Sequence, residues 1–519
     1  MALFSDVPEQ FNLAVFLLDR HLREGRGKKI AVYCEGETVT YAELAEAANR
    51  VGDALLQLGI ELKDRVVICL PDCPQFLASY LGAMKIGAVP VPVSTMAVPQ
   101  DYLYYLNDSR AKTLIVDQSI AANLRKVRSE LLYLKHFIVV GEAGVGELDY
   151  DSLVTGASTD LVACPTTKDD MAFWMYSSGT TGKPKGIVHL HHDMMYFMPP
   201  HCEVVSMGAG DIVFSTSKLY FSYGRNNSLE APFLCGAAVV LYPGRPEPEK
   251  VLDVVEAYHP TLFYSVPSSY NAMITYLDTT GRRCDLSSIR HCISAGEPLP
   301  KAIFKRWKEI FGIEILETLG STDVGAEYLS NKPGSIKPGS SGVLLPGFEG
   351  RLVDEKGRDA KEGEVGTLWV KSDGTAAFYW NNPEKTRESF HGEWFNTGDK
   401  FYTDSDGFYW YVGRADDIFK AGGIWVSPLE VEGTLLEHQA VNECAVIGAP
   451  DTAGLEKPMA FVVLSQGYTP SEDLERELQQ FVRDRIAHYK CPRWFRFTDE
   501  LPRTATGKLQ RYKLRASLK

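Results

Sequence analysis

The chain has 519 residues, of which 45% are hydrophobic and 23% charged, and these values are ordinary for globular proteins. This length exceeds what one hydrophobic core usually holds, so we expect roughly three folding units of about 150 residues each. The formal net charge of −13 argues against nucleic acid or an anionic membrane as a partner, because both require a concentrated basic surface.

The N-terminus and the longest apolar run predict a cytoplasmic protein without a membrane partner. The first ten residues carry acids where a secretory signal would carry lysines. The longest uncharged apolar run, 231–244, is shorter than the about 20 residues that span a bilayer, and two prolines interrupt it. The ten cysteines include no C-x-x-C pair, so we expect buried free thiols rather than a zinc or redox site.

Alternating helices and strands predict a layered α/β architecture. Thr40 and Glu43 have the spacing of a capping box, and apolar residues repeat at helical spacing from there to residue 58. A short apolar strand at 65–70, a helix at 75–86 and an extended segment at 88–93 follow. This rhythm of strand, helix and strand implies largely parallel strands in an α/β fold.

A separate small lobe is expected after residues 413–417. Its pattern contains strands at 443–447 and 460–464, followed by a helix that Ser471 caps and that runs toward Tyr489. The last hundred or so residues therefore form a compact unit of their own.

The stretch Tyr176-Ser-Ser-Gly-Thr-Thr-Gly-Lys-Pro-Lys-Gly186 has the composition of a loop that wraps phosphates. It follows an apolar strand predicted at 172–176, and α/β sheets usually hold ligands where a strand ends. Glycines allow backbone N–H groups to approach an anion, while hydroxyls and lysines add donors and charge. The candidates are Ser177, Ser178, Gly179, Thr180, Thr181, Gly182, Lys183 and Lys185. The spacing of the glycines excludes a Walker A motif, and a mobile surface turn is the alternative.

Four further motifs follow, and together with this loop they resemble the signature of the adenylate-forming superfamily. They are Ser294-Ala-Gly-Glu-Pro298, Gly320-Ser-Thr-Asp323, Asn396-Thr-Gly-Asp399 with Gly413-Arg-Ala-Asp-Asp417, and Leu501-Pro-Arg-Thr-Ala-Thr-Gly-Lys508. The resemblance covers nearly the whole chain. The segments most similar to the benzoate-CoA ligase branch are Lys218-Leu-Tyr-Phe-Ser-Tyr-Gly224, Trp410-Tyr-Val-Gly-Arg414, Trp425-Val-Ser-Pro-Leu-Glu430 and Thr504-Ala-Thr-Gly-Lys-Leu-Gln-Arg511.

The resemblance implies the adenylate-forming fold, with an N-terminal ATP- and acid-binding domain at 1–415 and a mobile α+β lid domain at 416–519. It also implies a reaction in two steps. An aromatic carboxylate, benzoate or a substituted benzoate, attacks the α-phosphate of ATP to give an aryl-adenylate and pyrophosphate, and coenzyme A thiolate then displaces AMP. Both steps bring negative charges together, so cations and directed N–H groups must stabilise the transition state.

The resemblance assigns three catalytic residues and one metal ligand. Lys508 occupies the place of the adenylation lysine, which bridges carboxylate and α-phosphate. Thr322 corresponds to the residue that hydrogen-bonds the α-phosphate, and Asp416 to the hinge on which the lid turns between the two half-reactions. Asp323 aligns with an acid, usually glutamate, that meets Mg²⁺, and its shorter side chain leaves open whether it binds directly or through water. The composition of residues 320–323 also suits a helix N-cap.

The implied nucleotide and coenzyme A sites draw on several segments. Asp399 resembles the carboxylate that accepts the ribose hydroxyls, and Arg414 the guanidinium near ribose and phosphate. Leu319 stands where many relatives have tyrosine, so we expect apolar contact with adenine without ring stacking. Gly422 and Gly423 would let a loop approach the pantetheine arm, although such pairs are also common in plain turns. The other residues implied around the nucleotide are Ala295, Gly296, Glu297, Pro298, Gly320, Ser321 and Thr322.

For the acid site, the resemblance points to an aromatic-lined segment formed by Phe221, Ser222, Tyr223 and Gly224, although such a cluster also suits core packing. Residues 324–327 depart from the bulkier apolar or histidine-containing sequence expected there. Ala326 suggests extra room, so we expect an amino-, hydroxy- or fused-ring benzoate, with Arg225 or Glu327 as polar contacts if they face inward.

Three interpretations of function stay open at this point. The leading one is an aryl-CoA ligase, the second is a stand-alone adenylation enzyme that loads a carrier protein, and the third is a nucleotide-binding scaffold without turnover. Lys508, Thr322 and Asp399 argue against the third. The sequence leaves open whether the protein is a homodimer. His189-Leu-His-His192 lacks partners at zinc-site spacing, so we expect helix-surface or supporting roles for these histidines.

Overall fold

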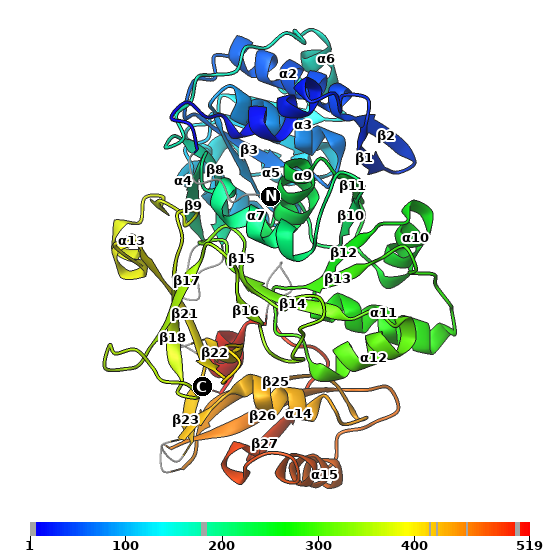
Figure 1. Cartoon of the computed structure of the whole chain (residues 1–519), viewed down its shortest axis with the longest axis vertical. Helices are drawn as coiled ribbons and strands as arrows, with labels where there is room; N and C mark the ends of the chain where they lie inside the picture. The colour runs from blue at the N-terminus through cyan, green and yellow to red at the C-terminus, as the bar shows by residue number, and fades with distance from the viewer. Residues whose placement is uncertain are drawn as a thin grey trace.

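The computed structural model describes residues 7–177, 184–414, 417–421, 424–452, 455–503 and 509–518. Figure 1 shows the N-terminal part, in blue, at one end of the long axis and the C-terminal part, in orange and red, at the other. Helices α10 (Pro248–Tyr258), α11 (Pro267–Thr280) and α12 (Lys301–Phe311) lie between these ends on one side (Figure 1). Within the described ranges, none of the helices has both the length and the apolar character of a membrane span.

The largest sheet has nine strands in the order β16-β15-β14-β13-β12-β10-β11-β1-β2. The strands from β14 to β1 are parallel, whereas β2, β15 and β16 are antiparallel at the two edges. β11 and β12 are buried along their whole length, as expected for a parallel sheet that is covered on both faces. The bounds are β1 (Ile30–Cys34), β2 (Glu37–Thr40), β10 (Ile212–Ser215), β11 (Ala238–Leu241), β12 (Leu262–Ser265), β13 (His291–Ser294), β14 (Ile315–Gly320), β15 (Glu327–Ser330) and β16 (Val343–Leu344).

A second sheet is parallel throughout and has the order β4-β3-β5-β6-β7. Its strands are β3 (Arg65–Cys69), β4 (Val89–Pro92), β5 (Thr113–Asp117), β6 (His136–Val140) and β7 (Leu148–Asp149). Helices α2 (Tyr41–Gln57) and α3 (Pro74–Lys85) pack on each other nearby with glycines at their contact. A Cβ atom at Gly82 would lie 2.5 Å from the carbonyl oxygen of Ala48, so only glycine allows this approach.

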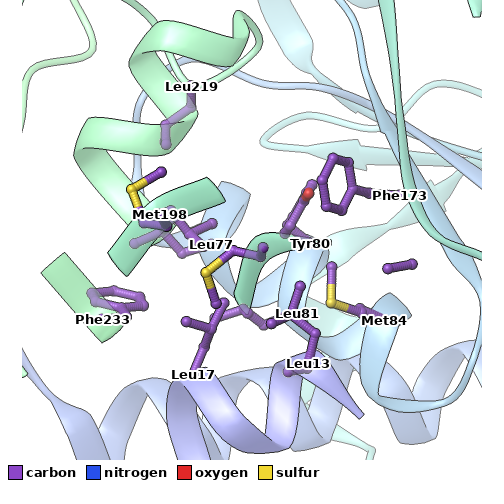
Figure 2. Packing of buried hydrophobic residues seen from close by; sticks show 14 of the residues in the cluster. Leu13, Leu17, Leu77, Tyr80, Leu81, Met84, Phe173, Met198, Leu219 and Phe233 are labelled. Carbon is purple, nitrogen blue, oxygen red and sulfur yellow. The ribbon is translucent and has the colours of Figure 1, made fainter. Parts of the chain in front are cut away.

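The main hydrophobic core surrounds α3. Figure 2 shows Leu77, Tyr80 and Leu81 of this helix close to Leu17 and Phe173, and all five side chains are fully buried. The rings of Tyr80 and Phe173 lie 6.3 Å apart between centroids. This core therefore joins the N-terminal helices to the strand that leads into the predicted phosphate loop.

Two antiparallel sheets complete the large N-terminal region. One has the order β19-β9-β8, and the other contains β17, β18, β20, β21 and β22. The bounds are β8 (Met171–Ser177), β9 (Lys185–Leu190), β19 (Phe378–Tyr379), β17 (Glu349–Val353), β18 (Gly366–Lys371), β20 (Phe390–His391), β21 (Trp394–Thr403) and β22 (Tyr409–Arg414). The strand predicted at 172–176 is confirmed as part of β8. Its continuation is the antiparallel strand β9, so the loop candidate connects a hairpin and does not end a strand of a parallel sheet.

The C-terminal part forms a smaller α+β unit, as predicted. A three-stranded sheet has the order β25-β26-β27, and a short hairpin pairs β23 with β24. The bounds are β23 (Phe419–Ala421), β24 (Ile424–Val426), β25 (Val441–Pro450), β26 (Glu456–Leu464), β27 (Trp494–Phe497), α14 (Pro428–Leu435), α15 (Glu472–Arg483) and α16 (Arg511–Ala516). The predicted class, layered α/β sheets plus a small α+β domain, is confirmed.

The helix signals in the sequence had mixed outcomes. Thr40 caps α2, accepting a hydrogen bond from the backbone N–H of Glu43, which confirms the capping box. Ser471 caps α15 as predicted, but the helix ends at Arg483 and not near Tyr489, and a separate 3-10 turn follows at His488–Lys490. The other helices are α1 (Arg20–Arg23), α4 (Pro99–Asp108), α5 (Gln118–Arg125), α6 (Tyr150–Thr155), α7 (Met194–Val204), α8 (Ser222–Arg225), α9 (Ala231–Cys235) and α13 (Pro383–Ser389). Shorter turns are π-helical at Val15–Asp19 and Asn226–Glu230 and 3-10 at Arg128–Glu130 and His488–Lys490.

A buried ion pair lies beside this core. Arg225 Nε is 3.1 Å from Glu230 Oε1, and the two side chains are 0% and 1% exposed. The guanidinium carbon of Arg225 lies 4.0 Å from the centroid of the Phe173 ring. Arg225 therefore contacts core residues, which leaves Glu327 as the stronger of the two polar candidates for the acid site.

We expect the Arg225→Leu substitution to lower the free energy of unfolding by about 3–5 kcal/mol, because it leaves a buried carboxylate without its counter-charge. The double substitution Arg225→Leu with Glu230→Leu should recover most of this loss. Urea unfolding followed by tryptophan fluorescence measures both. The exposed pair of Arg306 and Asp278 provides the control, since Arg306→Leu should cost less than about 1 kcal/mol. Equal destabilisation by the single and double core variants would contradict this account.

Candidate active site

The carboxyl ends of the central parallel strands meet at one edge of the nine-stranded sheet. Ser265 at the end of β12 pairs with Ser294 at the end of β13, which in turn pairs with Glu317 of β14. The segment Ser294–Pro298, expected near adenine, starts at this edge, and Gly296 has a φ of 88°, a left-handed conformation that favours glycine. Ligands of α/β sheets usually bind at such an edge.

The predicted phosphate-contacting loop, residues 320–326, connects β14 to β15 in a tight turn. A Cβ atom at Gly320 would lie 2.3 Å from the carbonyl oxygen of Ala326, so this position requires glycine. The buried His189 holds the loop from outside, with Nε2 2.8 Å from the carbonyl oxygen of Thr322 and Nδ1 2.8 Å from Asp193 Oδ2. Because a carbonyl oxygen only accepts, Nε2 donates to it. The second contact needs a proton on either partner, and burial raises the pKa of Asp193.

Asp323, the predicted metal ligand, contacts the predicted phosphate-binding Lys185. Its Oδ1 atom accepts hydrogen bonds from Lys185 Nζ at 2.8 Å and from the Tyr379 hydroxyl at 2.5 Å. Lys185 Nζ also lies 3.9 Å from the centroid of the Tyr379 ring. Burial alone would raise the pKa of Asp323, but the charge and hydrogen bond of Lys185, together with the Tyr379 hydroxyl and the charge of Arg414, outweigh burial and hold the pKa below its ordinary value.

The oxygen ligands available at Asp323 suit a metal ion that enters the site already bound to a substrate. Both protein contacts fall on Oδ1, which leaves Oδ2 for a metal or for a water bound to one. Among the described residues, no group of three or more His, Cys, Asp or Glu side chains could hold a metal ion by itself. Mg²⁺ is commonly bound by one or two carboxylates together with substrate phosphates and water, and this arrangement fits that pattern.

The acid-binding candidates lie directly against the phosphate-contacting loop. The Ser222 hydroxyl is 3.0 Å from the Thr322 hydroxyl, which joins the two predicted sites. Tyr223 is half-buried, its hydroxyl donates to the carbonyl oxygen of Ile293 at 3.3 Å, and desolvation of this hydroxyl raises its pKa well above the ordinary value. Gly224 is buried at the start of α8, where a Cβ atom would lie 2.0 Å from the carbonyl oxygen of Lys218. The remaining two candidates, Phe221 and Ala326, are half-buried and buried respectively.

The predicted ribose site is a pair across two neighbouring strands. Asp399 of β21 lies opposite Arg414 of β22, and Arg414 Nη1 is 3.2 Å from Asp399 Oδ1. The Tyr411 hydroxyl donates to the same oxygen at 3.3 Å. The charge of Asp399 is the largest of the effects that raise the pKa of Arg414. The carboxylate is thus held in place in a position from which it could accept ribose hydroxyls.

Several predicted residues lie outside the described ranges. They are Ser178, Gly179, Thr180, Thr181, Gly182, Lys183, Asp416, Gly422, Gly423 and Lys508. Ser177 pairs with Lys185 at the open end of the β8–β9 hairpin. Arg503 pairs with Leu509 across the segment that contains Lys508, and Arg503 Nη1 lies 3.5 Å from Glu297 Oε1 of the predicted adenine segment.

Sequence patterns missed Tyr379 and Glu317, which the structure brings to the site, and they left the role of His189 open between two alternatives. His189 is a buried strand residue that positions Thr322, so the expected helix-surface role was wrong and the supporting role was right. Tyr379, more than fifty positions from Asp323, gave no local signal. Glu317 did give one, because it is an acid within the otherwise buried strand β14, where an unpaired carboxylate is unusual.

Glu317 is a buried acid that holds its proton at neutral pH. Burial raises its pKa from 4.5 to about 8, and a backbone hydrogen bond from Leu299 only partly opposes this. Its Oε2 atom has no hydrogen-bond partner among the described residues. In the unfolded chain the same group would ionise near pH 4.5. The stability that the folded chain gains from the bound proton is therefore complete below pH 4.5 and is lost as the pH rises toward 8.

The substitution Glu317→Gln should remove this pH dependence. Between pH 5 and pH 8, each pH unit lowers the free energy of unfolding of the unsubstituted protein by up to about 1.4 kcal/mol through this group, and glutamine cannot ionise. Melting curves of both proteins across this range should diverge, with the variant gaining relative stability as the pH rises. Parallel curves would show that Glu317 ionises normally.

Comparisons with known proteins agree with this geometry. The sequence pattern of AMP-binding enzymes matches residues 18–380, and that of the AMP-binding enzyme C-terminal domain matches residues 430–508. A benzoate–CoA ligase of Thauera aromatica is 42% identical, with 98% of this chain and 97% of that protein covered. A 4-hydroxybenzoate–CoA/benzoate–CoA ligase of Rhodopseudomonas palustris is 41% identical over 97% of this chain and 94% of that protein.

Solved structures show the same likeness. The structure of an anthranilate CoA ligase in complex with anthranoyl-AMP superposes with a TM-score of 0.94 at 40% identity, covering 99% of this chain and 98% of that chain. A benzoate CoA ligase from Burkholderia xenovorans LB400 superposes with a TM-score of 0.89 at 39% identity, covering 97% of this chain and 100% of that chain. From these matches, this chain belongs to the family of AMP-binding enzymes.

Proposed function

We propose that this protein is an ATP-dependent, AMP-forming ligase that joins an aromatic carboxylic acid to coenzyme A through an aryl-adenylate. The observation that carries the proposal is the 3.0 Å contact between the hydroxyls of Ser222 and Thr322. Ser222 belongs to the segment that resembles the acid site, and Thr322 to the loop that resembles the α-phosphate site. A carboxylate and an α-phosphate bound at these residues would therefore meet, as adenylate formation requires.

The side chains around this contact suit the charges of the reaction. Lys185 and Arg414 supply positive charge beside Asp323 and Asp399, although the chain as a whole is acidic. Bound Mg²⁺ would neutralise the phosphates of ATP, and Asp323 Oδ2 is the atom we propose to contact it, directly or through water. Asp399 would accept the ribose hydroxyls, and the segment 295–298 with Leu319 would line the adenine.

The C-terminal part supplies the remaining cation in this proposal. The contact between Arg503 and Glu297 supports an approach of the segment that contains Lys508 to the nucleotide site. Lys508 would bridge the acid carboxylate and the α-phosphate, stabilising charge that develops as pyrophosphate leaves. Relatives that are benzoate– and hydroxybenzoate–CoA ligases support an aromatic acid as the substrate.

The first test is AMP release with ATP, coenzyme A and a panel of aromatic and aliphatic acids. We expect aromatic acids to be preferred, and better turnover of alkanoates would contradict the proposal. Lys508→Met should lower adenylate formation by about 100- to 1,000-fold, because one aimed cation of the transition state is lost. Lys513→Met, which removes an exposed lysine of the neighbouring helix α16, is the matched control and should leave the rate unchanged. Substitution of a carrier protein for coenzyme A in the thioester assay tests the alternative acceptor.

A second test addresses the proposed hinge at Asp416, where the lid domain 416–519 would begin. Asp416→Pro fixes one backbone angle and should spare pyrophosphate release while slowing thioester formation at least tenfold. Asp416→Ala removes the same carboxylate but keeps backbone freedom, so it should slow the second step much less. An equal loss of both half-reactions in the proline variant would refute the hinge.

A further inference from the structure

Glu327 and His201 form a buried polar pair behind the acid-binding segment. Glu327 Oε2 lies 3.8 Å from His201 Nδ1, and the two side chains are 3% and 0% exposed. Neither carboxylate oxygen of Glu327 has a hydrogen-bond partner among the described residues, and the same holds for His201 Nδ1. Native proteins rarely leave buried polar atoms unmatched, so this pair needs an explanation beyond packing.

The pair is connected to the acid-binding candidates on two sides. Glu327 directly follows Ala326 and lies opposite Gly320 in the pairing of β14 with β15. On the other side, His201 Nε2 is 2.9 Å from the hydroxyl of Tyr264. The ring centroid of Tyr264 is 6.2 Å from that of Tyr223 in an edge-on arrangement. The unmatched oxygens therefore sit next to the residues that would surround the ring of a bound acid.

The second buried pair of this region does not offer the same chemistry. The charge of Glu230 is balanced by Arg225 at 3.1 Å, and that pair faces Phe173 of the core. The carboxylate oxygens of Glu230 and of Glu327 both lack a hydrogen-bond partner among the described residues, but Glu327 has an imidazole at 3.8 Å where Glu230 has a guanidinium at 3.1 Å. A carboxylate in such a position binds a hydrogen-bond donor and rejects an apolar group of the same size, because the apolar group leaves it unmatched.

We infer that Glu327, positioned by His201, accepts a hydrogen bond from an amino or hydroxyl substituent on the ring of the aromatic acid. The inference rests on the proposed function and narrows its substrate class to benzoates with a hydrogen-bond-donating substituent. Ala326 provides space for such a substituent next to the strand. His201 acts in this scheme through Glu327 and through its contact with Tyr264.

The test compares acids that differ only in the donor. Aminobenzoates and methylbenzoates with ortho, meta or para substitution are similar in size, but the methyl group donates no hydrogen bond. We expect at least one aminobenzoate or hydroxybenzoate to exceed the matching methylbenzoate by about 10- to 100-fold in kcat/KM. Glu327→Leu should collapse this ratio toward one, and Glu327→Gln, which keeps an acceptor oxygen, should retain part of it.

A matched control separates this effect from loss of stability. Asp211 is also a buried acid, but it lies at the opposite ends of the parallel strands, just before β10, where Arg290 pairs with it at 2.9 Å. Asp211→Asn should leave unchanged the ratio of kcat/KM between the donor-bearing benzoate and the matching methylbenzoate, even if the substitution lowers the stability of the protein. Circular dichroism and melting temperatures establish that each variant is folded. If Glu327→Leu does not fold, the comparison is made with Glu327→Gln instead.

The outcomes distinguish the two claims. If no aromatic acid releases AMP, the proposed function itself fails. If aromatic acids are activated but methylbenzoates match aminobenzoates and hydroxybenzoates in the unsubstituted protein, only the inference about Glu327 fails. An unchanged preference for the donor-bearing acid in folded Glu327→Leu would overturn it as well.

Discussion

The candidate site depends on hydrogen bonds between two sheets that are built from distant parts of the chain. The hairpin β8–β9 carries Lys185 and His189, and the loop between β14 and β15 carries Thr322 and Asp323. Lys185 holds the side chain of Asp323, while His189 holds the carbonyl group of Thr322. Because the main chain of Thr322 is fixed in this way, its hydroxyl is free to face Ser222 and the space in which an acid and a phosphate would meet.

The buried carboxylates of the candidate site have three kinds of surroundings, and each kind suits a different role. Asp323 and Asp399 stay close to cations and can offer negative charge to a metal or to hydroxyls. Burial raises the pKa of Glu317 to about 8, and no cation of the described residues opposes this rise. Glu327 has a histidine at 3.8 Å and no hydrogen bond within the described chain. Although the chain is acidic overall, Lys185 and Arg414 place positive charge beside two of these carboxylates.

Much of the fold follows from local sequence patterns that predict a helix or a strand without knowledge of its tertiary contacts. The capping box at Thr40 and the apolar repeat after it predict α2, and the strand and helix signals at 65–93 predict β3, α3 and β4. The antiparallel partner of β8 was not predicted, because an apolar strand carries no mark of the direction of its neighbour. The end of α15 was placed too late, since the hydrophobic repeat continues to Ile486 although the helix itself ends at Arg483.

By itself, the sequence determined the class of fold and the family, and it predicted the membership of the site, because short motifs of glycine, hydroxyl and charged residues are typical of nucleotide-binding loops. Only the tertiary structure decided which of these residues meet. The pairing of Lys185 with Asp323, the support of Thr322 by His189 and the partnership of Arg225 with Glu230 all join segments or orientations that local spacing does not encode. Burial and the nearest charge, which set the pKa of Glu317 and leave Glu327 unmatched, arise only when the strands pack together.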